Sequence, residues 1–369
     1  MNDRRLRILH VDPERAWGGG EVQVLSLTRH LLKSGHHSVV AADPRGVLSS
    51  RLQAAGFPTV PLRIRNHLDF WAAFQLRRLV RNNDYDIVHF HTARAHALSP
   101  YLRRLKAKRI VTRRMDYPLR TGIITRLLYS HSVEKVIAIS QGVRSALVAG
   151  GIPKSHIRLI PSGVDTARFT PDPAARARVR SQYDIDAQTP LVISVGALVE
   201  RKGHDLLLAT AQQLKKKGCH VRYLICGDGP LRSPLEAQVR TLALSRDVQF
   251  TGFCSNIADF LSAADIFIHV PHHEGLGVAV IEALAAGLPT IASKVGGIPE
   301  IIEEQKTGLL IPPQNVDLLI TSLIRLLSVP TFARQLGKAG QKFVRARFDI
   351  SITTQANEAL YMEVLADTV

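Results

Sequence analysis

The sequence predicts an α/β protein built from two doubly wound domains in tandem. Its 369 residues are about twice the size of a common single domain. Short apolar segments alternate with segments of helical period, as in β-α-β units that form a parallel sheet. This alternation stops near residue 171 and starts again at residue 191, so the chain carries two such series.

The first series contains five strand candidates. A glycine-containing loop and an amphipathic segment at residues 22–33 follow the first of them, which is the order of a β-α-β unit. The strand candidates are residues 6–11, 37–42, 86–90, 109–112 and 136–139.

The second series begins after a proline-containing stretch. Pro171, Pro173 and Pro190 flank a charged segment, which predicts an interdomain linker at residues 171–190. The strand candidates that follow are residues 191–195, 221–226, 248–251, 266–270 and 290–293.

These series predict the domain organisation. We expect an N-terminal domain at residues 1–170, a C-terminal domain at residues 191–345, and a last helix at residues 346–369 that packs back on the first domain. Doubly wound sheets bind ligands at the carboxyl ends of their strands. We therefore expect the two Rossmann-like domains to face each other across a cleft that holds the active site.

Bulk composition indicates a folded globular chain. Hydrophobic residues make up 46% of it and the mean hydropathy is +0.04, which argues against disorder. No apolar run approaches the roughly 18 residues that span a bilayer, and the amino terminus lacks the apolar region of a secretory signal. Cys219, Cys226 and Cys254 have no metal-ligand spacing and are expected to be reduced thiols. These features predict a cytoplasmic protein.

The excess of positive charge lies entirely in the first half of the chain. The net charge is +17, and residues 1–170 hold 28 Lys and Arg against 11 Asp and Glu. Such segregation predicts an anionic partner for the first domain, such as a membrane surface, a phosphorylated ligand or nucleic acid. Solubility is the alternative explanation. Nucleic acid is disfavoured because aromatic side chains, which would stack on bases, are only 6% of the chain.

A basic run with interleaved Leu and Ile lies within the first domain, and residues 119–129 have a similar composition. The members of the run are Arg103, Arg104, Lys106, Lys108, Arg109, Arg113 and Arg114. Basic and apolar residues in such a mixture are typical of segments that lie on an anionic bilayer. We therefore expect peripheral association with the inner, cytoplasmic face of a membrane.

The stretch from Glu274 to Glu282 is the strongest local signal of chemistry. Glu274 follows a strand candidate, and Gly275 and Gly277 let backbone N–H groups approach a ligand closely. The helix expected from Val278 points its amino end at the same place, which makes an anion site suited to a diphosphate. Glu282 stands alone in an apolar run. Burying a carboxylate there costs free energy unless hydroxyls or other donors form hydrogen bonds to it. The plain alternative is that Glu282 points to solvent.

Two further loops follow the first strand candidate of each domain. In residues 196–203, Arg201 and Lys202 can neutralise a leaving diphosphate, although an exposed basic turn is the alternative. Residues 18–21 contain three glycines before a helix but lack the Gly-x-Gly-x-x-Gly spacing, and no Gly-Lys-Ser or Gly-Lys-Thr loop is present. Dinucleotide oxidation and nucleoside triphosphate hydrolysis are therefore poorly supported.

Histidines gather near one strand end in the first domain, at positions 89, 91 and 96. Zinc sites usually include Cys, Asp or Glu ligands beside histidine, and none lies among these histidines. Because His89 and His91 flank Phe90 at a strand end, only one of the two can easily face a ligand. The adjacent His272 and His273 do not complete a ligand set either. We expect no metal site, and we expect His91, at the carboxyl end of its strand, to contact a ligand.

Taken in order, these stretches resemble the retaining glycosyltransferases of family 4, which have the GT-B fold of two facing Rossmann-like domains. Glu274 and Glu282, separated by seven residues, match that family's signature. Residues 196–203, the turn at residues 227–230, residues 161–165 and the early glycine loop fall in the family's order. The resemblance spans nearly the whole chain.

The resemblance implies transfer of a hexose-type sugar from a UDP- or GDP-linked donor, with retention of configuration and without a metal or other cofactor. It implies reaction-centre roles for Glu274, Arg201 and Lys202, and it places Glu282 on the donor ribose. The other donor-binding candidates are Gly275, Leu276, Gly277, Val278, Gly196, Gly227 and Gly19. The acceptor-side candidates are Gly20, His91, Arg114 and Asp116. The basic first domain favours an anionic glycan or lipid-linked acceptor, such as a lipopolysaccharide core intermediate.

The sequence departs from the family pattern at three positions. Ala197 stands where many members have Arg, which leaves more of the phosphate charge to Arg201. Ser162 stands where many members have Asn. Arg114 stands where many members have the His of a Thr-x-His, so no role for that histidine is carried over to this chain.

Two other functions remain open at this point. A nucleotide-sugar epimerase shares the fold but needs no acceptor, which would leave the basic first domain unexplained. A non-catalytic partner subunit could also use the same frame. The retained Glu274, Glu282, Arg201 and Lys202 argue against a chain that has lost turnover.

Overall fold

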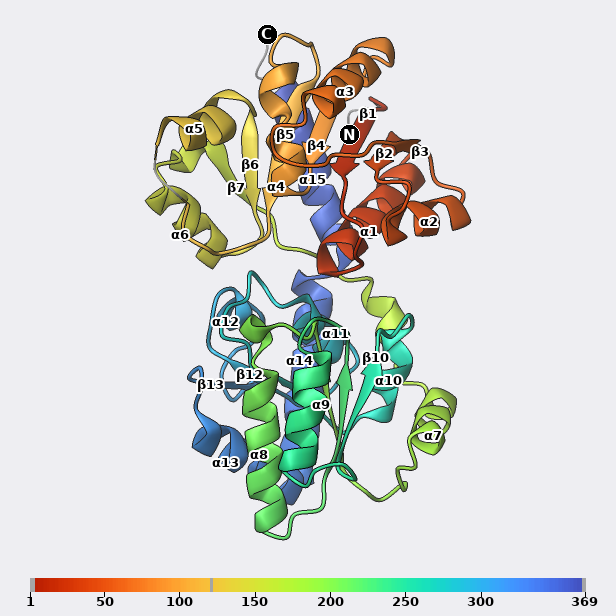
Figure 1. Cartoon of the computed structure of the whole chain (residues 1–369), viewed down its shortest axis with the longest axis vertical. Coiled ribbons are helices and arrows are strands. Elements are labelled where there is room, and N and C mark those ends of the chain that lie inside the picture. The colour runs from red at the N-terminus through yellow and green to blue at the C-terminus, as the bar shows by residue number, and fades with distance from the viewer. Residues whose placement is uncertain (1–3, 120–121, 367–369) are drawn as a thin grey trace. The chain divides into compact units, whose positions relative to one another are not determined.

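The computed structural model describes residues 4–119 and 122–366 and divides into two compact units (Figure 1). Unit 1 comprises Met1–Gly163 and Ile350–Val369, and unit 2 comprises Val164–Asp349. Each unit contains one parallel β-sheet with helices packed on it. The prediction of two doubly wound α/β domains is therefore confirmed.

Unit 1 has a seven-stranded sheet in the order β3-β2-β1-β4-β5-β6-β7, and all neighbours run parallel. The strands are β1 (Arg7–Asp12), β2 (His37–Ala42), β3 (Thr59–Pro61), β4 (Ile87–Phe90), β5 (Lys108–Arg113), β6 (Lys135–Ala138) and β7 (Ile157–Leu159). The order reverses between β1 and β4, whose register pairs His10 with His89. At such a reversal the carboxyl ends of the two strands form the ligand-binding edge of the sheet.

The helices of unit 1 come from both ends of the chain. They are α1 (Gly19–Lys33), α2 (Val47–Ala54), α3 (Phe70–Asn82), α4 (Ala93–His96), α5 (Ile123–Arg126), α6 (Gln141–Ala149) and α15 (Ile350–Ala366), with shorter turns η1 (Ser99–Leu102), η2 (Leu127–His131) and η3 (Lys154–His156). On α1, Val24, Leu27 and Leu31 recur at helical spacing and are buried. Leu27 shares a core cluster with Ile87 of β4 and Tyr361 of α15. The last helix of the chain therefore completes the core of unit 1.

Unit 2 has a six-stranded parallel sheet in the order β10-β9-β8-β11-β12-β13. The strands are β8 (Leu191–Val195), β9 (Arg222–Cys226), β10 (Val248–Gly252), β11 (Ile266–His269), β12 (Thr290–Ser293) and β13 (Leu309–Ile311). Strands β11 and β12 are buried along their whole length, as central strands of a parallel sheet covered on both faces are. The order reverses between β8 and β11.

The helices of unit 2 surround this sheet. They are η4 (Thr166–Phe169), α7 (Pro173–Gln182), η5 (Glu200–Lys202), α8 (His204–Lys216), α9 (Arg232–Thr241), α10 (Ile257–Ala263), α11 (Val278–Ala285), α12 (Ile298–Ile301), α13 (Val316–Ser328) and α14 (Pro330–Arg347). Leu207 of α8 and Leu323 of α13 belong to one buried cluster with Val192 and Ile268 of the central strands. The apolar helix faces and the sheet thus share a single core.

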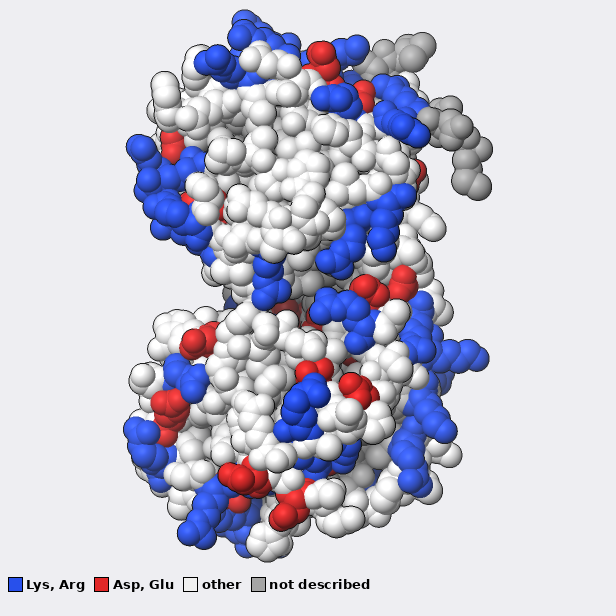
Figure 2. Space-filling view, turned by 90° about the vertical axis from the view of Figure 1, so that its right-hand side faces the viewer, with Lys and Arg blue, Asp and Glu red and all other residues white. Residues whose placement is uncertain are grey.

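The two units differ in surface charge. Among the charged side chains on the face of unit 1 in Figure 2, Lys and Arg clearly exceed Asp and Glu, whereas basic and acidic side chains are mixed on unit 2. This matches the sequence, in which residues 1–170 hold 28 Lys and Arg against 11 Asp and Glu. The segregation of charge along the chain is therefore also a segregation on the folded surface.

The predicted linker at residues 171–190 is wrong. Half of it is α7, which packs against α10 inside unit 2. The Asp172 carboxylate accepts the N–H of Ala174 at 2.8 Å, and Pro173 occupies the first turn of the helix. An N-cap aspartate followed by proline starts a helix, so these residues are a helix beginning and not a break in the fold.

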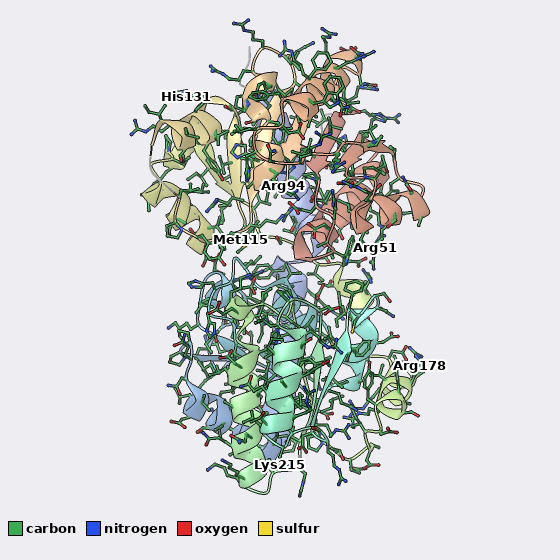
Figure 3. The ribbon with its side chains drawn as sticks, in the orientation of Figure 1. Arg51, Arg94, Met115, His131, Arg178 and Lys215 are labelled. Carbon is green, nitrogen blue, oxygen red and sulfur yellow. The ribbon has the colours of Figure 1, made fainter. Side chains whose placement is uncertain are left out.

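Side chains of α7 tie this segment to unit 2. Arg178, which points outward in Figure 3, pairs with Asp259 of α10 at 2.6 Å. The chain passes from one unit to the other after Gly163 and again after Asp349. The last helix accordingly begins at Ile350, and residues 367–369 of the predicted C-terminal segment lie outside the described residues.

No single helix in the described parts of the chain is long and apolar enough to cross a membrane. By length and composition alone, one bent pair passes the same test, α13 with α14, which meet at 103°. These two helices contribute Leu319, Leu326 and Leu336 to the buried cluster of unit 2.

Candidate active site

Two loops at the carboxyl edge of the unit 2 sheet lie side by side. One leaves β8 and includes η5, and the other leaves β11 and leads to α11. The N–H of His272 donates to the Arg201 carbonyl at 2.8 Å. Gly203 has φ +65°, and a Cβ there would lie 2.1 Å from the Val270 carbonyl oxygen, so only glycine permits this approach. The loops form one site because β8 and β11 are neighbours where the strand order reverses.

Glu274 accepts two hydrogen bonds at this edge. Lys202 Nζ and His269 Nε2 both donate to its Oε2, His269 at 2.9 Å. The side chains of Glu274 and Lys202 are each only 12% exposed. Burial alone would raise the pKa of Glu274, but the Lys202 charge and the His269 bond outweigh it and hold that pKa well below its usual range. Burial lowers the pKa of His269, so a neutral imidazole donates to a fixed carboxylate.

The Arg201 guanidinium supplies an unused donor beside this pair. Its Nη1 is buried and has no hydrogen-bond partner among the described residues. The Lys202 stem runs across Gly196, where an added Cβ would lie 3.5 Å from Lys202 Cδ. Gly227 has φ +147°, and a Cβ there would lie 1.9 Å from the Gly196 carbonyl oxygen, which requires glycine. A buried donor without a partner costs free energy, and an anionic ligand would remove that cost by accepting a hydrogen bond from it. This edge therefore suits an anionic ligand.

Glu282 is a largely buried carboxylate on α11. Gly277, with φ +100°, precedes the helix and Val278 starts it. The loop residues Gly275, Leu276 and Gly277 are all buried. Burial raises the pKa of Glu282 to about 7, against the lowering effect of Arg168, and none of the described residues hydrogen-bonds to the carboxylate. Both of its oxygens can therefore accept hydrogen bonds from ligand hydroxyls.

The carboxyl edge of the unit 1 sheet carries a second buried polar cluster. Asp12 ends β1, is fully buried, and has an Oδ2 without a hydrogen-bond partner among the described residues. Burial and the nearby Glu21 carboxylate raise the pKa of Asp12 to about 7. Glu21 accepts the N–H of Gly18 at 2.7 Å at the start of α1. The Arg114 side chain lies 3.6 Å from the position of a Cβ on Gly20, so this cluster surrounds the beginning of the helix.

Arg114 is followed by a chain of two histidines. Its Nη2 donates to His91 Nδ1 at 3.1 Å, and His91 Nε2 lies 2.9 Å from His10 Nδ1. Burial lowers the pKa of both rings, that of His10 to about 3, so both are neutral. Because arginine only donates, His91 carries its proton on Nε2 and donates it to His10. The remaining N–H of His10, on Nε2, has no partner among the described residues.

A third histidine lies beside this chain. His89 Nδ1 is 2.7 Å from the Tyr361 hydroxyl, and its Nε2 is 2.7 Å from Thr112 Oγ1. The ring nitrogens of His10, His89 and His91 lie within 4.8 Å of one another, close enough to hold a metal ion. Among the described residues, no other group of three His, Cys, Asp or Glu side chains does so. Both nitrogens of His89 and both of His91 already have partners, which favours a hydrogen-bonded network. That the protein needs no metal stays a prediction.

A small pocket opens onto this cluster in unit 1. Its lining includes Gln23, His91, Thr112, Arg114 and Asn357. Gly19, the first residue of α1, has open space where a side chain would lie. Asp116 does not line the pocket, and its Oδ1 is buried without a hydrogen bond to any described residue. The structure thus brings Gly20, His91 and Arg114 together, while Asp116 is not part of the pocket lining.

Four polar residues of these sites were not predicted from the sequence: His10, Asp12, Glu21 and His269. Asp12 and His269 end strands β1 and β11, and His10 lies two residues before the end of β1. A polar side chain at that position beside the reversal of strand order is the signal that could have found them. His96, in contrast, bonds to the Leu128 carbonyl at 2.9 Å and is structural.

The basic run at residues 103–114 does not form one surface, which corrects the prediction. The exposed members are Arg103, Arg104 and Lys106. Arg109 lies in β5, is buried and pairs with Glu134, and Arg114 belongs to the cluster described above. The apolar residues between them mark a strand covered on both faces, not a membrane-facing segment. In the second stretch, residues 119–129, positions 120 and 121 lie outside the described residues.

Two glycosyltransferase family models together match most of the chain. The model of Glycosyltransferase Family 4 matches residues 17–168, and that of Glycosyl transferases group 1 matches residues 175–343. A GDP-mannose-dependent alpha-(1-6)-phosphatidylinositol monomannoside mannosyltransferase of Mycolicibacterium smegmatis is 31% identical over 73% of this chain and 74% of its own length. The chain belongs to this glycosyltransferase family.

Other relatives of this glycosyltransferase agree in class and in fold. The lipopolysaccharide core biosynthesis glycosyltransferase LpsD of Rhizobium meliloti is 30% identical over 78% of each chain. A glycosyltransferase from Rickettsia africae superposes with a TM-score of 0.89 over 99% of this chain and all of that one, at 22% identity. Anabaena HepE, solved with UDP and glucose, gives 0.87 over 96% and 99% at 20% identity. The predicted GT-B fold and the predicted glycosyl transfer from a nucleotide sugar are confirmed.

Proposed function

We propose that this glycosyltransferase moves a hexose from a UDP- or GDP-linked donor, with retention, to an anionic, lipid-linked glycan of the cell envelope. The observation that carries this is the edge of unit 2. Lys202 and Glu274 form a buried ion pair there, and Arg201 has a donor without a partner among the described residues. Glu282 adds a carboxylate whose oxygens have no described donor. These are the groups that a sugar joined to a nucleoside diphosphate requires.

Glu282 binds the ribose of the donor in this proposal. A ribose diol offers two O–H donors, which match the two oxygens of one carboxylate. Hydrogen bonds to the charged form lower a carboxyl pKa. The pKa of Glu282, about 7 in the free enzyme, therefore falls when the donor binds, and binding releases a proton near neutral pH.

Arg201 and Lys202 bind the diphosphate, together with the beginning of α11 after Gly277. Negative charge on the diphosphate grows as the bond to the sugar breaks, so these cations stabilise the transition state more than the bound donor. Glu274 holds Lys202 in place and offers its carboxylate to a hydroxyl of the sugar. Because the chain supplies its own cations, no metal is needed for the leaving group.

The acceptor binds to unit 1 in this proposal. Arg114 and His91 line the pocket there, and the basic surface of unit 1 attracts an anionic molecule. The relatives from Mycolicibacterium smegmatis and Rhizobium meliloti are named for a phosphatidylinositol glycolipid and for lipopolysaccharide core. These names and the charge of unit 1 support a glycolipid acceptor at the inner face of a membrane.

A donor and acceptor screen tests the proposed function. The protein is incubated with UDP- and GDP-hexoses, with and without anionic glycolipids, and release of nucleoside diphosphate is measured. We expect release that depends on the acceptor and a product whose anomeric configuration, read by NMR, matches the donor. Inversion would disprove retention. Conversion of the donor sugar to an isomer without acceptor would identify an epimerase instead.

A further inference from the structure

One helix of unit 1 exposes its aromatic side chains. On α3, Phe70, Trp71 and Phe74 are 65%, 63% and 56% exposed. The opposite face of α3 is buried through Ala72, Ala73, Leu76 and Val80. Leu68 and Tyr101 are exposed as well, and we call Leu68, Phe70, Trp71, Phe74 and Tyr101 the aromatic patch. Contiguous exposed apolar groups on a folded protein indicate an interaction surface.

The aromatic patch is held together by α3 and η1. Trp71 stacks on Phe74 with ring centroids 5.9 Å apart and 25° between the planes. Phe70 meets the Tyr101 ring edge-on at 5.9 Å. The Asp69 carboxylate caps α3 and also accepts a backbone N–H of the preceding loop at 2.9 Å. The patch is therefore arranged before any partner binds.

Exposed basic residues lie close in the sequence to the aromatic patch. Arg78 follows Phe74 by four residues and Trp71 by seven, so the three share one face of α3. The other exposed basic residues of these segments are Arg63, Arg65, Arg81, Arg103, Arg104 and Lys106. Asp69, the helix cap, is the one acidic residue in the sequence from position 62 to 83. Lys and Arg are correspondingly dense at the end of unit 1 that carries α3 (Figures 1 and 2).

We propose that the aromatic patch docks unit 1 on an anionic membrane, with Phe70, Trp71 and Phe74 at the depth of the lipid headgroups and the flanking arginines on lipid phosphates. This rests on the proposed function, in which the acceptor is lipid-linked. Aromatic side chains concentrate at the membrane–water interface. Each Lys or Arg near an anionic leaflet adds to the attraction.

Charge complementarity selects a lipid surface over other occupants. A second copy of the chain would bring the same positive charge against the patch, and the two would repel. A neutral apolar partner would leave the surrounding guanidinium groups without a counter-charge. An anionic bilayer interface meets both requirements, because it combines phosphate charge with an apolar layer just below it.

Trp71 itself reports the docking. The chain has two tryptophans, so a Trp17→Phe variant leaves Trp71 as the single fluorophore. We expect its emission to shift to shorter wavelength on vesicles of phosphatidylglycerol and phosphatidylcholine, and brominated lipid to quench it. Pure phosphatidylcholine vesicles should have a much smaller effect. Neither donor nor acceptor is present, so the result is independent of whether the transferase activity has been assigned correctly.

Variants of the aromatic patch separate its contribution from charge alone. Phe70→Ser with Phe74→Ser should reduce vesicle flotation at least tenfold. Because both side chains are exposed, the melting temperature should not fall, and circular dichroism verifies the fold. Arg334→Glu with Lys338→Glu, at exposed positions of unit 2, is the matched charge control for Arg78→Glu with Arg81→Glu. The control pair should float like the parent, and the α3 pair should not.

Several outcomes would overturn this docking surface. Unchanged Trp71 emission on vesicles that do carry the protein would place the contact elsewhere. The same conclusion would follow if the serine variant floated as well as the parent. A Trp71 shift that appears with protein concentration, and without lipid, would instead make the patch a self-association surface.

Discussion

Units 1 and 2 share a strand order but hold different chemistry at the same edge of their sheets. The order reverses between β1 and β4 in unit 1 and between β8 and β11 in unit 2. At that edge unit 2 holds the buried ion pair of Lys202 and Glu274. Unit 1 holds neutral His10 and His91 beside Asp12, whose pKa is about 7. The frame fixes where a site forms, and the side chains decide its chemistry.

Surface charge is distributed in the opposite way. Unit 1 carries the positive surface, while unit 2 mixes the two signs (Figure 2). Unit 2, whose surface mixes the two signs, holds the buried ion pair of Lys202 and Glu274. We infer that the buried charged side chains of unit 2 bind one anionic ligand in a fixed position. The basic surface of unit 1 attracts a larger anionic partner from a distance. The following changes test that contrast, starting with the largest expected effect.

Lys202→Ala should lower kcat on the order of a hundredfold, because it removes a cation from the leaving diphosphate. Steady-state kinetics with saturating donor and acceptor measures this. Lys215→Ala is the control, since Lys215 lies at the opposite end of α8 from η5 and forms an exposed pair with Asp247 (Figure 3). If the two variants have the same kcat, Lys202 does not stabilise the leaving diphosphate.

Glu282→Gln should weaken donor binding more than tenfold, because it removes a charged acceptor of ribose hydroxyls worth roughly 1.5–3 kcal/mol. In the parent, donor affinity should rise with pH up to about 7, since binding favours the ionised form of a carboxyl whose pKa burial has raised. Calorimetry in two buffers of different ionisation enthalpy detects the released proton. Equal affinity in parent and variant would remove Glu282 from the donor site.

Arg114→His introduces the residue that many family members carry at this position. It removes the donor to His91 and a positive charge from the pocket of unit 1. We expect the acceptor KM to rise about fivefold, the worth of roughly 1 kcal/mol for one hydrogen bond, while the donor Kd stays within about twofold. A change confined to donor binding would place Arg114 on the donor side and contradict the acceptor role of unit 1.

Asp12→Asn should change the pH dependence of stability by a few degrees in Tm. Burial raises the pKa of Asp12 to about 7, so the folded state holds a proton that the unfolded state has released. The parent therefore loses stability as pH rises from about 4 to about 7, and the Asn variant lacks this loss. Thermal melts at pH 4 and pH 8 should show similar Tm values at pH 4 and a higher Tm for the variant at pH 8. Parallel curves would mean that Asp12 is not desolvated in this way.

EDTA should have the smallest effect, since the cations proposed for the leaving group are Arg201 and Lys202. Turnover after treatment with EDTA and desalting should match that of the untreated enzyme. Loss of turnover, restored by a divalent ion, would reject the metal-free mechanism. It would also direct attention to the three clustered histidines of unit 1.

The site of unit 2 could be predicted because its signal is local. Glu274, Gly277 and Glu282 lie within nine residues, and a strand end, a glycine turn and a helix start follow one another there. Backbone geometry alone brings such a segment to the ligand edge. The same locality misled the prediction at residues 171–190, where an aspartate–proline helix start has the composition of a linker.

The cluster of unit 1 could not be predicted, because it depends on strand order. His10 and His91 are far apart in the sequence, and they meet only because β1 and β4 are neighbours. Nothing in either strand alone specifies that pairing. The tautomer of His91 is set by the Arg114 donor, and the raised pKa of Asp12 is caused by burial, so both depend on the packed unit.

The sequence by itself determined two doubly wound domains, the residues gathered at the carboxyl edge of the unit 2 sheet and the charge of the first domain, because periodicity, short-range spacing and net charge do not depend on packing. Only the tertiary structure decided which side chains are covered. The sequence presents Phe70, Trp71 and Phe74 as apolar residues of an amphipathic helix. Since unit 1 buries the face of α3 that carries Leu76 and Val80, the three aromatic rings are left in solvent.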